Sequence, residues 1–326
     1  MSKHPNDKLL SEIKNVVQLR KHPEFDIIKI LSHQEIVEST PRAIEYVMNP
    51  WLPLQGIAFV YAATGVGKTM FTLNVAYAIA AGGRFLKYTS SLPRKVLYVD
   101  GEMAYSQVHA RYMQIVKQQG ELFFKDNFHL LTPEKALARL PKVCSAEGQE
   151  FYNKRIEELG IEVLVLDNLS TLSAIDENNS EQWKVIQDWL ISLRSKGITI
   201  IVVHHAGKDK RGYRGTSRML DIADTAISLQ DVSDNEMESE VVNSKKFKIE
   251  YQKNRSFGGK DAMAFEVSLN SEGWEFDSME KNNTNRIVSM INLKMKPADI
   301  SLELGISKSY VYRMIKEARR KGMIID

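Results

Sequence analysis

Residues 58–69 read AFVYAATGVGKT, an apolar run followed at once by a glycine-containing loop. A phosphate-binding loop has the pattern Gly, any four residues, then Gly-Lys-Ser/Thr, and Gly67, Lys68 and Thr69 match its end. Ala62 replaces the first glycine, which is tolerated only if the φ angle of Ala62 is negative. The stretch therefore constrains the chain to a strand, a loop and a helix in that order.

The loop predicts a nucleotide site with ATP and Mg²⁺ as its ligands. Lys68 would reach the β- and γ-phosphates, and the Thr69 hydroxyl would ligate Mg²⁺. Backbone N–H groups of the loop would surround the phosphates at the N-terminus of the next helix. The residues expected around the nucleotide are Ala63, Thr64, Gly65, Val66, Gly67, Lys68 and Thr69. A glycine turn without a ligand is the alternative, and the helical run that follows disfavours it.

Composition limits the class of protein. The 326 residues suit one large and one smaller domain, and 43% apolar with 26% charged residues is typical of a globular protein. The lone Cys144 excludes an internal disulfide and a cysteine-based zinc site. The first ten residues contain no apolar signal core, and no apolar run is long enough to span a membrane. We therefore expect a cytoplasmic protein without a membrane partner.

The region from 51 to 276 alternates between two kinds of segment. Short runs rich in β-branched residues predict buried strands at 57–61, 95–100, 162–167 and 198–203. Helical stretches separate these strands at 68–81, 105–119, 149–159 and 181–196. This alternation predicts an α/β fold with a mainly parallel sheet. Later segments at 245–252 and 263–269 alternate like antiparallel strands, with a turn at 256–259.

The chain therefore divides into four parts. Residues 1–50 predict a small helical segment, with helices at 8–20 and 32–48, that could contact other subunits. Residues 51–276 form the α/β region, and 277–284 read as a polar linker. Residues 285–326 predict a helix-turn-helix, in which Ile287, Met290, Ile291 and Leu293 make one apolar face. Ser307 suits the N-cap of its last helix, and Val311 and Ile315 point inward.

Three of the predicted strands end in polar residues. Asp167 follows four apolar residues, and a carboxylate at this place can hold Mg²⁺ directly or through water. Asp100 and Glu102 end another strand, where they are either solvated turn residues or acids that orient a water molecule. His204 and His205 end the last strand. A metal site there is disfavoured, because neighbouring strand residues point to opposite faces.

Together these stretches resemble the RepA-like branch of the RecA/DnaB hexameric motor superfamily, over roughly residues 51–276. The most specific segments are WLPLQG, ATGVGKT, VLYVDGEM, VLVLDNLSTL, VVHHAGK and RGTSRMLDIADTAISL. The resemblance implies a RecA-like P-loop NTPase core. It also implies an ATP-hydrolysing DNA helicase or translocase of a plasmid or phage, acting in DNA replication as a homo-oligomeric, hexameric ring on single-stranded DNA.

The resemblance also implies roles for individual residues. Glu102 occupies the place of the catalytic glutamate, and His205 that of the γ-phosphate sensor. Lys253 and Arg255 match a Lys-x-Arg pair that such helicases supply to the neighbouring subunit's γ-phosphate, where an arginine stabilises transition-state charge. An ordinary solvated basic turn is the alternative for this pair.

Two basic segments predict DNA contacts. In motors of this kind, the loop after the sensor strand grips single strands, and here it carries Lys208, Lys210, Arg211, Arg214 and Arg218. The last helix of the tail resembles a DNA-recognition helix and presents Lys308, Ser309, Tyr312 and Arg313. Residues 277–326 hold ten Lys and Arg against six Asp and Glu, an excess of +4 in a chain of net charge +3. The tail could instead bind a protein partner, such as an initiator or a primase.

Two other functions stay open on the sequence. The chain could be a DNA-binding ATPase that acts in recombination without unwinding DNA. It could also be an ATP-gated transcription regulator. Glu102 favours ATP turnover over simple switching, and the basic loop favours a DNA-lined channel over binding by the tail alone.

Overall fold

A computed structural model describes residues 30–40, 43–173, 180–205, 220–232, 245–270, 273–276, 279–320 and 322–324. The chain divides into two compact units, residues 1–43 and 44–326. The predicted helix at 8–20 and the basic loop with Lys208, Lys210, Arg211, Arg214 and Arg218 lie outside the described residues. Among the described residues, no helix combines the length and apolar character needed to cross a membrane.

The predicted helix at 32–48 is wrong over most of its length. Ser32 caps a short helix, α2 (His33–Glu38), and Glu35 completes a capping box with it. The later residues instead form strand β1 (Tyr46–Met48), which pairs antiparallel with β2 (Leu52–Pro53). The β-branched Val47 and its neighbour Met48 are fully buried in this ribbon, and their burial outweighs local helix propensity.

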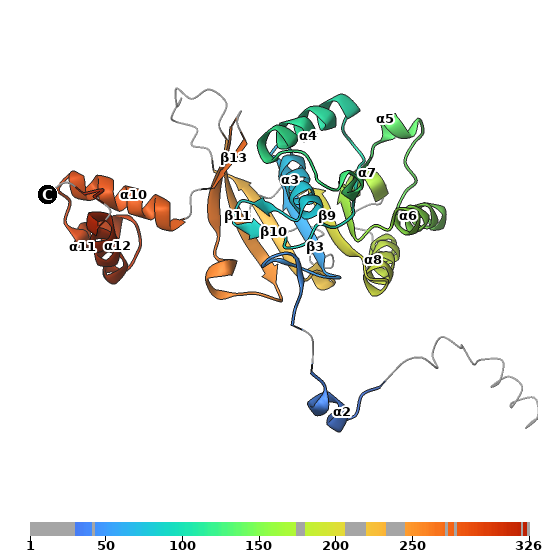
Figure 1. The fold of residues 1–326 in the computed structure, drawn as a ribbon, viewed down its shortest axis with the longest axis horizontal. Helices are drawn as coiled ribbons and strands as arrows, with labels where there is room; N and C mark the ends of the chain where they lie inside the picture. Colours follow the sequence, from blue (N-terminus) through green and yellow to red (C-terminus); the bar gives the residue numbers. More distant parts are fainter. Residues whose placement is uncertain are drawn as a thin grey trace, which may run out of the picture. The chain divides into compact units, whose positions relative to one another are not determined.

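A nine-stranded sheet forms the centre of the second unit (Figure 1). Its spatial order is β13–β12–β11–β10–β3–β9–β8–β6–β7. The strands from β10 to β7 in this order run parallel, whereas β11, β12 and β13 continue the sheet antiparallel. The strands span Ile57–Ala62 (β3), Val96–Asp100 (β6), Phe128–Leu131 (β7), Val163–Asp167 (β8), Thr199–His205 (β9), Thr225–Asp231 (β10), Lys245–Asn254 (β11), Phe265–Asn270 (β12) and Gly273–Phe276 (β13).

All four predicted parallel strands and both antiparallel strands are confirmed, with ends shifted by one or two residues. The sequence analysis did not assign β7, β10 or β13. The main helices are α3 (Lys68–Ala81), α4 (Tyr105–Gln119), α5 (Pro133–Ala136), α6 (Ala146–Leu159), α7 (Leu169–Ser173) and α8 (Ser180–Ser195), and short 3₁₀ turns span Lys125–Asn127 and Gly259–Ala262. The predicted bounds of α3 and α4 are confirmed without a shift.

The apolar core has two layers, one on each face of the sheet. Side chains of β3 alternate between them, because successive side chains of a strand point to opposite faces. Ala58 and Val60 pack with α3 and α4, whereas Ile57, Phe59 and Tyr61 pack with α6, α7 and α8. Helix α3 is buried along nearly its whole length and is apolar on all sides, as expected for a helix enclosed by other elements. The central part of the sheet is therefore covered on both faces, and polar side chains of its strands reach solvent mainly at the strand ends.

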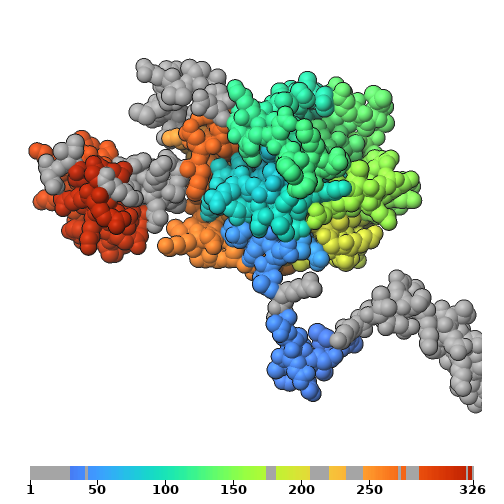
Figure 2. Space-filling model, viewed as in Figure 1, coloured from blue at the N-terminus to red at the C-terminus, as the bar shows by residue number. Residues whose placement is uncertain are grey.

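An early segment of the chain packs beside β11, although the two are distant in the sequence. A small hairpin of β4 (Arg84–Phe85) and β5 (Tyr88–Thr89) packs there. The Tyr251 hydroxyl donates to the Tyr88 hydroxyl at 2.8 Å, and Lys87 lies 4.2 Å from the ring centre of Phe265. Figure 2 shows the orange atoms of the late strands next to the blue and cyan atoms of the early segments.

The C-terminal residues form three helices with their own apolar cluster: α10 (Met279–Asn292), α11 (Pro297–Glu303) and α12 (Lys308–Arg320). Ile287, Val311 and Ile315 are buried as predicted, but Leu293 is 73% exposed because α10 ends one residue before it. The prediction of a linker at 277–284 is wrong from Met279 onward, since a helix can begin in a polar stretch without an apolar face.

The turn between α11 and α12 contains the N-cap predicted at Ser307. Pro297 is the first residue of α11, and Gly305 adopts a φ of +62° in the turn. The Tyr310 N–H donates to the Ser307 hydroxyl at 3.3 Å, which places Ser307 as the N-cap of α12. Lys308, Ser309, Tyr312 and Arg313 are exposed on α12.

Candidate nucleotide site

The carboxyl ends of four adjacent strands meet at one edge of the sheet. Ala62 at the end of β3 pairs with His205 at the end of β9, and Asp100 pairs with Asp167 at the ends of β6 and β8. Strand β9 lies between β3 and β8, although it follows both in the sequence. Ligands of open α/β sheets bind at such carboxyl ends, so the predicted site residues gather where a ligand is expected.

The loop between β3 and α3 has the backbone that a phosphate-binding loop requires. Gly65 and Gly67 adopt φ angles of +80° and +82°, which a residue with a Cβ rarely tolerates. Ala62 is the last residue of β3 and does not have a positive φ angle. The alanine that replaces the first glycine of the pattern therefore causes no backbone strain. The N-terminus of α3 follows directly and adds its partial positive charge.

Lys68 is buried at the base of this loop. Its ammonium donates to the backbone oxygens of Ala62 at 2.8 Å and Ala63 at 3.0 Å, and it lies 3.1 Å from Nδ1 of His205. Burial lowers the pKa of Lys68 to about 8, and the negative charges of Asp167 and Glu102 oppose this shift. A phosphate would supply the opposite charge that these carbonyl partners lack.

Asp167 is almost fully buried between two hydroxyl groups. The Tyr98 hydroxyl donates to Oδ2 of Asp167 at 2.6 Å, and Thr69 forms a second side-chain hydrogen bond to the same carboxylate. Burial raises the pKa of Asp167 to about 6, while the Tyr98 hydrogen bond lowers it and the neighbouring Asp100 raises it. A buried carboxylate next to a threonine hydroxyl suits a hard divalent cation, so Thr69 and Asp167 fit the ligand set expected for Mg²⁺.

Asp100 fixes the backbone that carries Glu102. Its Oδ1 accepts the N–H groups of Glu102 at 2.8 Å and Met103 at 2.7 Å. Burial raises the pKa of Asp100, and these two hydrogen bonds oppose the shift. The Glu102 side chain is 56% exposed and accepts a hydrogen bond from the amide of Asn168 at 2.5 Å. Asp100 is therefore a buried structural acid, whereas Glu102 is open to water.

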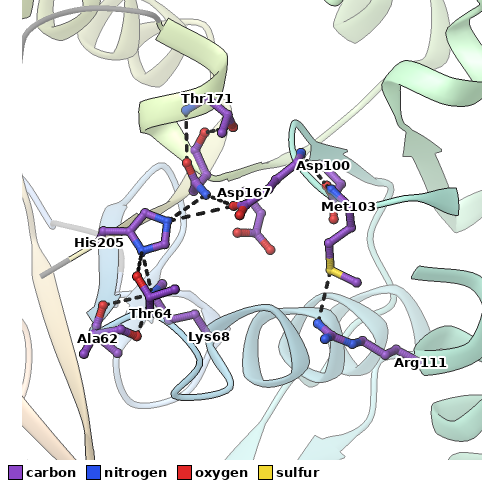
Figure 3. A network of polar contacts seen from close by, with 12 residues as sticks. Ala62, Thr64, Lys68, Asp100, Met103, Arg111, Asp167, Thr171 and His205 are labelled. Carbon is purple, nitrogen blue, oxygen red and sulfur yellow. Dashed lines mark hydrogen bonds and ion pairs between the residues drawn. The ribbon is translucent and has the colours of Figure 1, made fainter. Parts of the chain in front are cut away.

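His205, and not His204, faces the loop. The His205 ring lies 3.4 Å from the Thr64 hydroxyl and 3.0 Å from Nδ2 of Asn168 (Figure 3). His204 is 2% exposed within the core. The ring of His205 therefore connects the phosphate loop to the residues at the end of β8.

A cavity of about 880 Å³ opens beside these groups. Residues outside the predicted set line part of it: Met70, Met103, Arg111, Gln114, Asn168, Lys245, Phe247, Leu269 and Asn270. Figure 3 shows Met103 and Arg111 facing each other, and Nη1 of Arg111 lies 3.2 Å from the Met103 sulfur. Asn168 directly follows Asp167, and this adjacency was the one sequence signal that could have identified it.

Lys253 and Arg255 lie at the opposite edge of the sheet. Thr225 pairs with both Ala58, near the start of β3, and Asn254, so the end of β11 is separated from Ala62 by roughly 13 Å along β3. Lys253 donates to the backbone oxygens of Leu220 and Asp221, and Arg255 donates to the Asp221 oxygen at 2.9 Å. The structure therefore does not bring this pair to the chain's own phosphate loop.

Comparison with known proteins identifies the family. A family model described as an AAA domain matches residues 23–211, which include the loop, Glu102, Asp167 and His205. The chain belongs to this AAA domain family. Among solved structures, a KaiC-like protein from the hyperthermophilic archaeon Pyrococcus horikoshii is similar, with a TM-score of 0.51 and 14% identity. The match covers 73% of this chain and 100% of that chain. No curated protein sequence matches the chain.

The predicted fold class is thereby confirmed, since this AAA domain has a RecA-like P-loop NTPase core with a mostly parallel sheet. It is a P-loop ATPase, and the positive-φ glycines, the buried Lys68 and the pairing of Thr69 with Asp167 fit a Mg²⁺-bound nucleotide. The family match ends before Lys253, Arg255 and the C-terminal helices. The roles expected of these residues therefore have no support from the family and have to be argued from the structure.

Proposed function

We propose that this ATPase is a ring-forming DNA helicase or translocase that uses ATP hydrolysis to move along single-stranded DNA. The role in replication of a plasmid or phage rests on the sequence resemblance alone. The observation that supports the proposal is the position of Lys253 and Arg255. They lie at the edge of the sheet opposite the phosphate loop, so a role in catalysis requires the nucleotide of a neighbouring subunit.

The hydrolytic half of the site lies at the carboxyl ends of the strands. Lys68 binds the β- and γ-phosphates, and Mg²⁺ at Thr69 and Asp167 would neutralise phosphate charge. Glu102 is open to solvent and orients the attacking water, from which it accepts a proton. The water oxygen bonds to the γ-phosphorus as the bond to the β–γ bridging oxygen breaks, leaving ADP and phosphate. His205 contacts the γ-phosphate from the end of β9.

The second half comes from a neighbouring subunit. Arg255 is 49% exposed in its side chain, and the backbone oxygen of Asp221 and the carboxylate of Asp224, with Oδ1 at 3.7 Å, hold its guanidinium at the surface. A guanidinium supplied from a neighbour stabilises the charge of the transferred phosphoryl group. Such a residue acts only in an assembly in which the start of one sheet faces the phosphate loop of the next. The proposal therefore requires a closed ring or a filament.

The DNA contacts belong to two regions. The basic segment with Lys208, Lys210, Arg211, Arg214 and Arg218 is proposed to contact single strands. On α12, the buried face of Val311, Met314, Ile315 and Ala318 leaves Lys308, Arg313, Lys316, Arg319 and Arg320 exposed. A basic helix face of this kind suits phosphate contacts with duplex DNA. An initiator or primase protein is the other partner that this surface could take.

A forked-duplex assay tests the proposal. Wild-type protein with ATP and Mg²⁺ is expected to release the labelled strand and to hydrolyse ATP faster when single-stranded DNA is present. The Lys68→Ala variant serves as the control and should do neither. ATP hydrolysis that single strands stimulate, without strand release, would favour a DNA-binding ATPase that does not unwind. Hydrolysis that is unaffected by any DNA would contradict both functions.

A further inference from the structure

The amide of Asn168 is held in one orientation at the centre of the site. Asn168 is 2% exposed, and its Oδ1 accepts the Thr171 N–H at 3.0 Å. Its Nδ2 therefore faces Glu102 Oε2 at 2.5 Å and His205 Nε2 at 3.0 Å. The two hydrogens of this nitrogen thus point to the two residues to which catalysis and γ-phosphate sensing are assigned.

A donor group lies within hydrogen-bond distance of each ring nitrogen of His205. The Lys68 ammonium lies 3.1 Å from Nδ1, and the Asn168 amide nitrogen lies 3.0 Å from Nε2. Lysine and an amide nitrogen can only donate, whereas a neutral imidazole accepts at one nitrogen and carries its proton on the other. Donation from Lys68 and donation from Asn168 are therefore mutually exclusive.

The occupant of the phosphate loop decides between the two. In the structure, the three protons of Lys68 have three acceptors: the backbone oxygens of Ala62 and Ala63, and His205 Nδ1. A bound γ-phosphate would attract the Lys68 ammonium and would thereby remove the donor from Nδ1. A proton can then bind Nδ1, where it donates to the phosphate, as the Nε2 proton is released to solvent. The imidazole stays neutral, and Nε2 becomes an acceptor for Asn168.

We propose that Asn168 is a positioning residue that transmits the tautomer of His205, and with it the presence of the γ-phosphate, to the carboxylate of Glu102. This inference rests on the proposed roles of Glu102 and His205. Asn168 already donates one hydrogen to Glu102 in the structure. Acceptance of its second hydrogen by His205 Nε2 then fixes the amide from both sides and holds Glu102 in line for the attacking water. Without the amide, the exposed Glu102 side chain is free to rotate.

Kinetics of Asn168→Ala test the positioning role. We expect kcat to fall about 10- to 100-fold, as for a small misplacement of a catalytic group, while KM for ATP changes less than about threefold. In a Glu102→Gln background, the same substitution should cause no further loss, because Asn168 acts through Glu102. Asn127→Ala is the matched control: it also removes a buried amide, which donates to Ala80 at 3.1 Å, and it should retain wild-type turnover.

The ¹⁵N resonances of the His205 ring test the transmission in wild-type protein, in which Asn168 and Glu102 are intact. Sedimented protein labelled at histidine is compared without nucleotide, with ADP, and with a non-hydrolysable ATP analogue, and His205→Gln assigns the signal. We expect the proton on Nε2 without nucleotide and with ADP, and on Nδ1 with the analogue. An unchanged tautomer, or wild-type kcat in Asn168→Ala, would overturn the inference. Wild-type turnover in Glu102→Gln would instead refute the proposed role of Glu102.

Discussion

The Tyr98 hydroxyl donates a 2.6 Å hydrogen bond to the Asp167 carboxylate from the neighbouring strand, and both groups are buried. The same hydroxyl lies 2.9 Å from the Thr72 hydroxyl on α3. The carboxylate assigned to Mg²⁺ is therefore held from the core of the protein by a residue that does not line the cavity.

Replacing Tyr98 with Phe should weaken Mg²⁺ binding. A hydrogen bond to a charged group contributes about 1.5–3 kcal/mol, so the half-saturating Mg²⁺ concentration for ATP hydrolysis should rise about 10-fold or more. Titration of ATPase activity with Mg²⁺ measures the effect. Tyr152→Phe is the control, because the buried Tyr152 hydroxyl donates to the Pro141 carbonyl at 3.0 Å, away from the site. An equal Mg²⁺ requirement in both variants would show that Tyr98 does not support Asp167.

The buried charge of Asp167 should destabilise the nucleotide-free protein in a pH-dependent way. Burial raises its pKa to about 6 in the folded state, from an ordinary value of 3.8, so the folded state binds more protons between these values. The free energy of unfolding therefore falls as pH rises from about 4 to about 6, because Asp167 then has to ionise while it is buried. The Asp167→Asn variant does not carry this charge. Its melting temperature, measured in EDTA and without nucleotide, should exceed that of wild type by a margin that grows over this pH range.

Thermal unfolding of both proteins between pH 4 and pH 8 measures this difference. The comparison cancels the titration of groups that the two proteins share. A melting-temperature difference that stays constant across the range would contradict the raised pKa of Asp167.

Neutralising α12 should weaken duplex binding without changing basal ATP hydrolysis. Substitution of Lys308, Arg313 and Lys316 by Ala removes exposed cations, and each lost phosphate contact should lower the salt slope of duplex binding by about one. Lys125→Ala and Lys154→Ala, which remove exposed cations elsewhere, are the controls. Fluorescence anisotropy of labelled duplex DNA at several salt concentrations measures the slope. An unchanged slope would favour a protein partner for this surface.

Local patterns in the sequence predicted the elements of the fold better than their spatial order. The apolar runs identified β3, β6, β8 and β9, because strands buried on both faces carry few polar residues. The sequence could not place β9 between β3 and β8, since that order depends on long-range pairing. The contact between Asn168 and Glu102, 66 positions apart, depends on the same order. The helix predicted at 32–48 failed because tertiary burial of Val47 and Met48 outweighed the local pattern.

Mixing two inactive variants tests whether two subunits share each catalytic site. Arg255→Ala should assemble but hydrolyse ATP at least about 10³-fold more slowly, as for loss of an arginine finger, and Lys68→Ala should be inactive. Arg194→Ala is the matched control, because Arg194 also contacts Asp224, at 3.4 Å, but belongs to α8. It should keep wild-type turnover.

In mixed assemblies of Arg255→Ala and Lys68→Ala, an intact Lys68 meets an intact Arg255 at some interfaces. We expect ATPase activity to return on mixing and to be highest near equal proportions of the two variants. The absence of any recovery at every ratio, with subunit exchange verified by fluorescence energy transfer, would contradict a shared site.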